Sequence, residues 1–226
     1  ATTEIYTLSL HDALPISLQA RQDELTQTQT QLEQALQQAS TELDSQQAAA
    51  EAQAAVTEEK RKAYEQATAA LDAYLKAQSQ KYQDPARHCS LDFTCPLPSV
   101  GRISTYFGEP DAVYNKPHTG ADMPAASGTL IYAVADGVVS AASARPSYGN
   151  CVQIDHGTAD DGSSYATLYA HMSSFCVSAG QTVHKGDVIG YVGNTGDVRG
   201  ANGGYHLHLE LRINGTRTDP LQYIPH

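Results

Sequence analysis

Two hydrophobic periodicities divide this chain. Leu18, Leu25 and Leu32 lie seven residues apart, and the apolar seam then shifts to Leu36. The segment 18–83 around them is rich in Gln, Ala, Glu and Thr and lacks Gly and Pro, so its composition favours helix. The heptad-like pattern predicts a long helix or coiled coil over this segment. The alternative is a solvated single helix or stalk, because a polar helix buries little area.

The second half of the chain has a strand-like pattern. Asp84-Pro85 is expected to end the helix, and residues 84–98 form a linker that contains Pro and Cys. Short β-type runs separated by turn residues follow, namely RISTYFG, TLIYAV, GVVSAAS, NCVQIDHG, SYATLYAHM, DVIGYVG and HLHLELRING. They predict an all-β domain over 99–226, mainly antiparallel, as a sheet or a barrel-like sandwich. The fold class expected for the whole chain is therefore α+β.

Composition and charge narrow the function classes. The 226-residue chain has a formal net charge of −11, which disfavours binding to the polyanionic backbone of nucleic acid. No apolar run reaches the ~18 residues of a transmembrane helix, and no signal peptide is visible. Residues 1–17 fit poorly with the pattern that follows. They are left unassigned as a leader that could be non-native, and an export signal could have been lost with the native start.

The four cysteines are Cys89, Cys95, Cys151 and Cys176, and none forms a CxxC pair, which argues against a thiolate zinc site. In an exported protein they could form two disulfides. Cys89 with Cys95 and Cys151 with Cys176 is one of the three connectivities. In a reducing compartment all four would be buried small residues or free thiols. The sequence alone does not choose between these states.

An HxH pair is the first candidate for chemistry. His206 and His208 lie within the run HLHLEL. Alternation along a strand puts both imidazoles on one face and Leu207, Leu209 and Leu211 on the other, where the leucines can enter a core. Two neighbouring imidazoles suit a metal ion or acid–base chemistry. A solvent-facing polar pair is an equally acceptable interpretation.

Two further signals are weak by themselves. His118 and Asp122 form an HxxxD pair in KPHTGADMP, where Gly120 and the flanking prolines argue against a helix. A bent extended segment could still bring both side chains together, and Zn²⁺ accepts nitrogen and oxygen ligands. His171 ends the run TLYAHM, and alternation puts it on the strand face of Tyr169. A lone strand histidine is more often structural than catalytic.

Together these residues fit a catalytic zinc site, which has three protein ligands and an open position for water. His118, Asp122 and one histidine of the HxH pair would be the ligands, and the other one would lie with His171 beside the water. Zinc lowers the pKa of bound water to about 7. A neutral histidine could take the proton of this water, and an imidazolium could stabilise the resulting oxyanion. The residues alone do not order the HxH pair.

From about Gly101 to Pro220 the chain resembles the LytM/lysostaphin-type zinc metallopeptidases, which cleave peptides in bacterial cell walls. The matching stretches occur in the family's order and are HTGADMPAASGTLIYAVADGVVSAA, YGNCVQIDHG, TLYAHMSS, VSAGQTVHKGDVIGYVGNTG and HLHLELRINGTRTDPLQYI. The resemblance implies a barrel-sandwich-like fold with a duplicated hybrid motif. It also implies Zn²⁺ as the cofactor.

The resemblance assigns a role to each candidate residue. It implies that His118, Asp122 and His208 are the metal ligands and that His171 and His206 are the catalytic histidines. The expected enzyme is a zinc metalloendopeptidase that hydrolyses stem peptides or cross-bridges of peptidoglycan during cell-wall remodelling or division. Such an enzyme would work outside the cytoplasm, in the cell envelope or as a secreted protein.

The chain departs from the family pattern before the HxH pair. The loop NTGDVRGANGGYHLH is longer and Gly-rich, and Tyr205 stands where the family has Pro. We expect this loop to border the substrate groove and to affect specificity. Glu210 shares a strand face with His206 and His208. It could orient one of them or form a cross-strand charge pair.

Other functions compete with the enzyme. Murein hydrolase activators of the EnvC/NlpD kind resemble this chain in joining a coiled coil to a domain of the same fold, and they activate cell-wall amidases. Their domains are degenerate, whereas this chain keeps all five positions, which favours the enzyme. A wall-binding module that holds zinc without turnover is a third interpretation. The helical half would pack on the cleft or bind an envelope or division protein near it.

Overall fold

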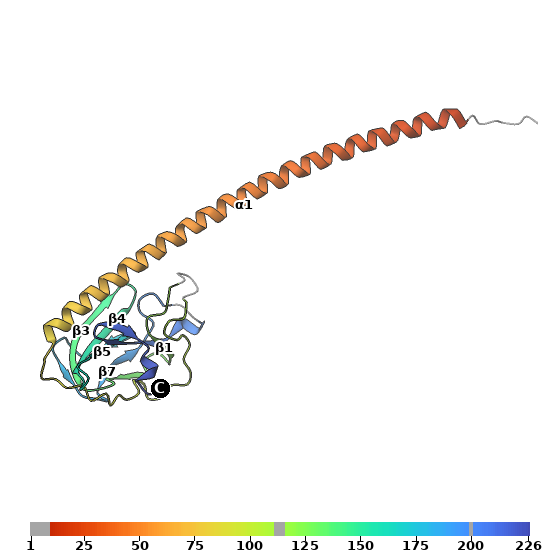
Figure 1. The fold of residues 1–226 in the computed structure, drawn as a ribbon. Coiled ribbons are helices and arrows are strands. Elements are labelled where there is room, and N and C mark those ends of the chain that lie inside the picture. Colours follow the sequence, from red (N-terminus) through yellow and green to blue (C-terminus); the bar gives the residue numbers. More distant parts are fainter. Residues whose placement is uncertain (1–9, 111–115, 199–200) are drawn as a thin grey trace, which may run out of the picture. The chain divides into compact units, whose positions relative to one another are not determined.

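The computed structural model describes residues 10–110, 116–198 and 201–226. One long helix, α1 (Leu10–Tyr82), precedes an antiparallel sheet (Figure 1). The strands are β1 (Ala121–Pro124), β2 (Leu130–Tyr132), β3 (Gly137–Arg145), β4 (Gly149–Thr158), β5 (Ser164–Phe175), β6 (Thr182–Val183), β7 (Val188–Val192), β8 (His206–Ile213) and β9 (Thr216–Thr218). Two 3-10 helices, η1 (Ala201–Gly204) and η2 (Pro220–Gln222), adjoin the last strands. The α+β class is confirmed, and the described strands do not close into a barrel.

The chain divides into two compact units, Ala1–Val56 and Thr57–His226, with the boundary inside α1. In the first unit the predicted seam is exposed: Leu18 and Leu25 are each 62% exposed and Leu32 is 60% exposed. Pairing of this seam into a coiled coil therefore stays a prediction. Of the unassigned leader, residues 1–9 lie outside the described residues and residues 10–17 continue the helix. No helix in the described ranges is long and apolar enough to cross a membrane.

In the second unit, the end of α1 packs on the sheet. Leu71 and Leu75 are 4% and 1% exposed and form an apolar cluster with residues of three strands, including Ala141, Cys151 and Leu168. Figure 1 shows this part of α1 lying along the sheet beside β3 and β4. Apolar residues spaced three or four apart at the end of the helix explain this contact, since they form one face.

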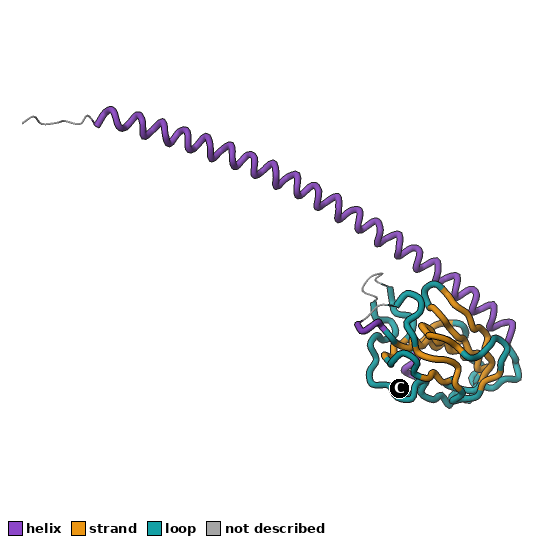
Figure 2. The backbone as a smooth tube through the Cα atoms, turned by 180° about the vertical axis from the view of Figure 1, so that it is seen from behind, coloured by secondary structure: helices purple, strands orange, loops and turns teal. Residues whose placement is uncertain are grey.

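The main core lies on the other face of the sheet. Strands β1, β8, β5, β4 and β3 are neighbours in that order, and every strand pair is antiparallel. Leu207, Leu209 and Leu211 are each 0% exposed in this core, which confirms the predicted inward face of β8. Figure 2 shows strands at the centre of the unit and loops around them. The opposite face of β8 is buried too, since the polar residues between His206 and Arg212 are also covered.

Some local predictions differ from the structure. The run RISTYFG was expected to be a strand, but it forms only an isolated bridge from Thr105 to Asp122. The predicted linker is packed: Cys89 and Phe93 are buried in the main core. The short strands β1, β6 and β9 had too few residues for a visible alternation. All four cysteines have free thiols, so neither guessed disulfide is present.

His156 is a structural histidine. It is 1% exposed, Nδ1 donates to the Asp136 carbonyl at 2.8 Å, and Nε2 lies 2.8 Å from Thr167 Oγ1. Burial is the main cause that lowers the pKa of His156 from 6.5 to about 4. Its contribution to stability is therefore complete above pH 6.5 and is lost as the pH falls through that value toward 4.

We expect His156 to make the unfolding free energy depend on pH. Between pH 7 and pH 4 the folded protein should lose about 3 kcal/mol through this group, because the unfolded chain binds the proton more readily. Urea unfolding at several pH values would measure the slope. The His156→Gln variant is the control, and it should show a flatter slope over this range. Equal slopes for both proteins would contradict the prediction.

Candidate metal centre

Strand pairing builds the centre from distant segments. β1 pairs antiparallel with β8, with Asp122 opposite His208 and Pro124 opposite His206. Residues directly opposite in such a pair point to the same face, so the Asp122 carboxylate meets the HxH imidazoles. Gly120 permits this approach, because a Cβ there would lie 2.2 Å from the carbonyl oxygen of Leu209. The bent extended segment expected for HxxxD is therefore present.

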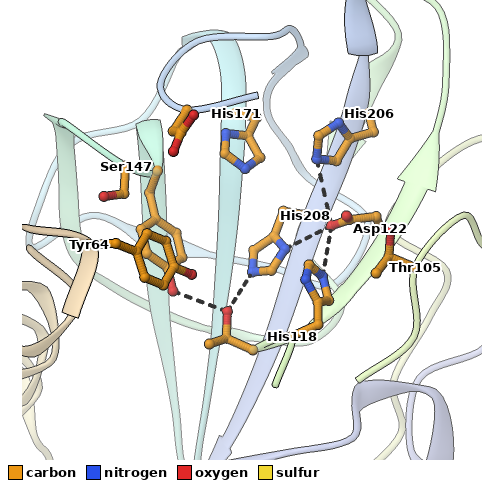
Figure 3. A pocket seen from close by; sticks show the side chains of 11 residues that line it. Tyr64, Thr105, His118, Asp122, Ser147, His171, His206 and His208 are labelled. Carbon is orange, nitrogen blue, oxygen red and sulfur yellow. Dashed lines mark hydrogen bonds and ion pairs between the residues drawn. The ribbon is translucent and has the colours of Figure 1, made fainter. Parts of the chain in front are cut away.

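Three side chains converge on one point. Asp122 Oδ1 lies 3.1 Å from His118 Nε2 and 2.8 Å from His208 Nδ1 (Figure 3). One ligand atom from each residue lies within 4.8 Å of the others. Tetrahedral zinc with bonds of about 2.0–2.1 Å separates its ligand atoms by roughly 3.3 Å, which is close to both distances from Asp122 Oδ1, and the nitrogen–oxygen donor set fits this ion. These residues could therefore hold a metal.

Electrostatics keep the carboxylate of the centre ionised. Burial alone would raise the pKa of Asp122, but hydrogen bonds from His118 and His208 hold it well below its usual range. Burial also disfavours a charged His208, yet Asp122 and Glu210 raise the pKa of His208 to about 9. Each partner thus stabilises the charge of the other. An ionised carboxylate is the form that binds a metal.

His206 and His171 lie beside this centre, with ring centroids 4.8 Å apart. His206 Nδ1 donates to the Gly204 carbonyl at 2.6 Å, and His171 Nδ1 donates to the Thr195 carbonyl at 2.8 Å. A carbonyl oxygen can only accept, so each neutral ring carries its lone pair on Nε2. His206 Nε2 lies 3.6 Å from Asp122 Oδ1. Both rings can therefore exchange a proton at Nε2.

His171 does not follow strand alternation. The sequence placed it on the face of Tyr169, which is buried in the main core, but its ring centroid lies 5.8 Å from that of His208. The reason is a φ of 58° at His171, in the left-handed region that non-glycine residues rarely adopt. Such strain is concentrated at functional sites. Burial, followed by the charges of His208 and His206, lowers the pKa of His171 to about 3.

The five predicted residues open onto one cleft of about 180 Å³. The loop before the HxH pair contributes Asp197, so this loop borders the cleft, and α1 contributes Tyr64. The sequence did not single out the other lining residues, which are Thr105, Thr119, Ser147 and Tyr148. Thr105, Thr119 and Tyr148 lie in stretches quoted above, but their residue types indicate no particular chemistry, and only the fold brings them to the cleft.

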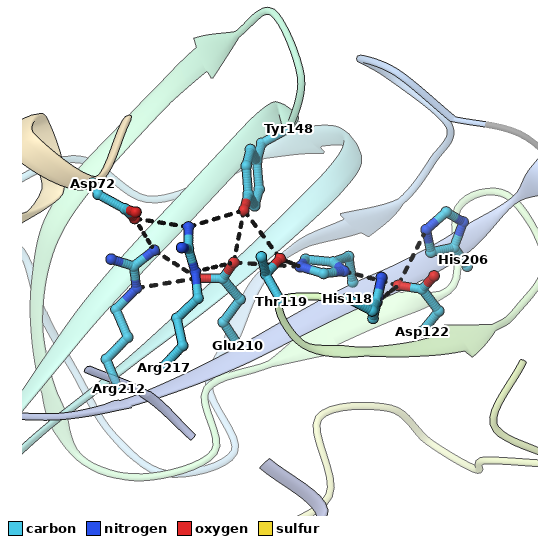
Figure 4. A network of polar contacts seen from close by, with 10 residues as sticks. Asp72, His118, Thr119, Asp122, Tyr148, His206, Glu210, Arg212 and Arg217 are labelled. Carbon is cyan, nitrogen blue, oxygen red and sulfur yellow. Dashed lines mark hydrogen bonds and ion pairs between the residues drawn. The ribbon is translucent and has the colours of Figure 1, made fainter. Parts of the chain in front are cut away.

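Glu210 forms the predicted charge pair with a neighbouring strand and also lies close to His208. It is 0% exposed, and Oε1 lies 3.6 Å from His208 Nε2 (Figure 4). The same carboxylate accepts hydrogen bonds from Arg212 and Arg217 at 2.6 and 3.1 Å. Burial would raise its pKa, but His208 and the two arginines keep the pKa of Glu210 well below its usual range. It is therefore an ionised group behind the candidate ligand.

Comparisons with known proteins show which family this part of the chain resembles. Residues 116–220 match the sequence model of Peptidase family M23. The DD-carboxypeptidase/endopeptidase Mpg of Neisseria meningitidis serogroup B is 42% identical over 123 residues, which are 53% of this chain and 26% of Mpg. The murein hydrolase activator NlpD of Escherichia coli K12 is 34% identical over 129 residues, which are 57% of this chain and 30% of NlpD. The chain thus spans less than a third of either relative.

Solved structures with a similar fold include that of a peptidase of lower sequence identity. It is the crystal structure of a zinc-containing peptidase from Vibrio cholerae, which is 28% identical with a TM-score of 0.50. The similarity covers 56% of this chain and 38% of that one. The shared part therefore corresponds to a domain rather than to the whole of either protein.

Proposed function

We propose that this chain is a zinc-dependent endopeptidase that hydrolyses peptide bonds in bacterial peptidoglycan, because residues 116–220 match the sequence model of peptidase family M23. The observation that carries the proposal is the convergence of His118, Asp122 and His208 beside two further histidines in one cleft. A metal held for structure alone is enclosed by four protein ligands, whereas a catalytic zinc keeps a position open. Three converging donors at a cleft favour catalysis.

The chain's own residues would divide the chemistry. His118 Nε2, Asp122 Oδ1 and His208 Nδ1 would hold the zinc ion. When bound, zinc supplies a Lewis acid for a carbonyl and makes water acidic near neutral pH. His171 and His206 would accept a proton at Nε2 when neutral and donate a hydrogen bond to an oxyanion when protonated.

The names of the relatives, rather than the shape of the cleft, support the proposed substrate class. Mpg is named as a DD-carboxypeptidase/endopeptidase, and NlpD as a murein hydrolase activator. The first name describes hydrolysis of peptide bonds, and the second refers to murein. We therefore place the substrate of this chain in stem peptides or cross-bridges, and its site of action in the cell envelope or outside the cell.

Hydrolysis of purified peptidoglycan by the full chain tests the proposal. We expect released peptides with new amino termini, no release after a chelator removes the metal, and recovery when Zn²⁺ is added back. Mass spectra of the products would identify the bond. A zinc-loaded chain that leaves every muropeptide intact would contradict the enzymatic function.

A second candidate is an activator of cell-wall amidases, which the similarity to NlpD favours. In this case the β domain would bind an amidase, and the exposed seam of α1 would bind an envelope or division protein. The retained set of two histidine ligands, one carboxylate and two further histidines supports the enzyme instead. An amidase assay with and without the chain separates the two: stimulation without any peptide release would favour the activator.

A further inference from the structure

Helix α1 supplies a carboxylate to the polar cluster on β8 and β9. Asp72 Oδ1 accepts hydrogen bonds from Nη2 of Arg212 at 2.8 Å and from Nη2 of Arg217 at 2.7 Å (Figure 4). Both arginines also donate to the buried carboxylate of Glu210. Asp72 therefore fixes the two cations that hold Glu210 behind the candidate metal centre.

Two hydroxyl groups extend this series of contacts from Glu210 to His208. Tyr148 OH donates to Glu210 Oε1 at 2.7 Å and lies 3.1 Å from Thr119 Oγ1, which lies 3.3 Å from His208 Nε2. If Nε2–H donates to Thr119, then Thr119 can donate to Tyr148 and Tyr148 to Glu210, so each donor has an acceptor. With this order, release of the Nδ1 proton that His208 donates to Asp122 Oδ1 at 2.8 Å would leave the lone pair of His208 on Nδ1, where a metal could bind.

The negative charge of Asp72 is needed to balance the charges of this cluster. Arg212 and Arg217 have side chains that are 6% and 20% exposed, and they face one buried carboxylate, Glu210. An excess of buried positive charge is costly, and here it would also lie behind a histidine that is to bind a dication. The Asp72 carboxylate balances the second arginine. It also holds both guanidinium groups in the orientation in which they donate to Glu210.

We propose that Asp72 is a positioning residue of the metal centre, acting through the arginine pair on Glu210, Tyr148 and Thr119 to present His208 Nδ1 to the metal. Partners of this kind fix the tautomer and the orientation of a metal-bound histidine. The end of α1 is then part of the metal centre, although it contributes no ligand. This inference rests on the proposed zinc-dependent function.

Zinc affinity of the full chain, measured by competition with a chromophoric chelator, is the test. The Asp72→Asn variant should bind zinc about 10-fold more weakly, at the lower end of the effect of outer partners on metal affinity. Asp72→Glu should restore most of the affinity, because it keeps the charge and adjoins a cavity of about 560 Å³. Tyr148→Phe should weaken binding as well. The double variant of Asp72→Asn and Tyr148→Phe should lose less zinc affinity than the product of the two single fold-changes. Both substitutions interrupt the same chain of contacts to His208, so their effects should not be independent.

Ser79→Ala is the matched control on the same helix. Ser79 Oγ accepts a hydrogen bond from the buried Gln153 Nε2 at 2.8 Å, a helix–sheet contact outside the path to His208. This variant should bind zinc like the wild type. Unchanged affinity of Asp72→Asn, equal losses in Asp72→Asn and Ser79→Ala, or no rescue by Asp72→Glu would each overturn the inference. A wild-type chain that binds no zinc would instead overturn the proposed function itself.

Discussion

An Asp122→Ala variant is expected to fold, to bind no stoichiometric zinc, and to release no peptides from peptidoglycan. Asp122 accepts hydrogen bonds from two of the candidate ligands and is the oxygen donor of the set. Its loss removes a ligand and leaves His118 and His208 without the carboxylate that brings them together. Hydrolysis should fall by more than roughly 10³-fold, because the Lewis acid and the acidified water are both lost. Metal analysis and a peptide-release assay on the same preparation would measure the two effects.

Asp160→Ala is the control for this variant. The Asp160 side chain is 97% exposed and pairs with His88, away from the cleft. It should therefore keep full zinc content and full activity. Wild-type zinc content in Asp122→Ala would show that the metal binds elsewhere, and would remove the proposed ligand set.

Substitution of either neighbouring histidine should have the second-largest effect on hydrolysis. It should differ from the first in leaving the zinc content unchanged. His206→Gln and His171→Gln should each keep zinc but lower kcat by about 10²–10⁴-fold, the usual contribution of general acid–base catalysis. Glutamine has a similar length and polarity but cannot exchange a proton near neutral pH. Steady-state kinetics on a defined peptide from the wall, with zinc content measured in parallel, would test this.

Comparison of the two experiments distinguishes the metal ligands from the catalytic histidines. His206 Nε2 lies 3.6 Å from Asp122 Oδ1, close enough that a ligand role for His206 has to be excluded by measurement. If His206→Gln lost zinc while His208→Gln retained it, the order of the HxH pair would be reversed. His184→Gln, on an exposed loop with a side chain that is 75% exposed, should change neither quantity.

Much of the β domain could be predicted because its strands carry strong local signals. In β8 the three leucines alternate with polar residues. The polar side chains lie on the opposite face, where they are buried and form polar contacts, as Arg212 does with Glu210 and Asp72. The HxxxD pair could be placed near the HxH pair only from the ligand number of a catalytic zinc site and from the resemblance, since no local rule brings residues 118 and 208 together. Pairing of β1 with β8 provides the physical reason.

Other features could not be read from the sequence for identifiable reasons. Alternation failed at His171, because its left-handed backbone turns the ring toward the cleft. RISTYFG has the composition of a strand, but only Thr105 forms a bridge to a neighbour. The contact of Asp72 with Arg212 spans 140 positions and has no periodic signal. Long-range polar contacts of this kind depend on how elements pack, and packing is what a sequence pattern leaves out.

The inherited module and the folding module of this chain have different boundaries. The family match begins at residue 116, whereas the compact unit begins at Thr57. Residues between these points contribute Leu71 and Leu75 to the covered face of the sheet and Phe93 to the core. A fragment that keeps this compact unit therefore has to start at Thr57 or earlier. A fragment that begins at residue 116 would lack the helix residues that cover this face of the sheet. Its properties would therefore not represent those of the full chain.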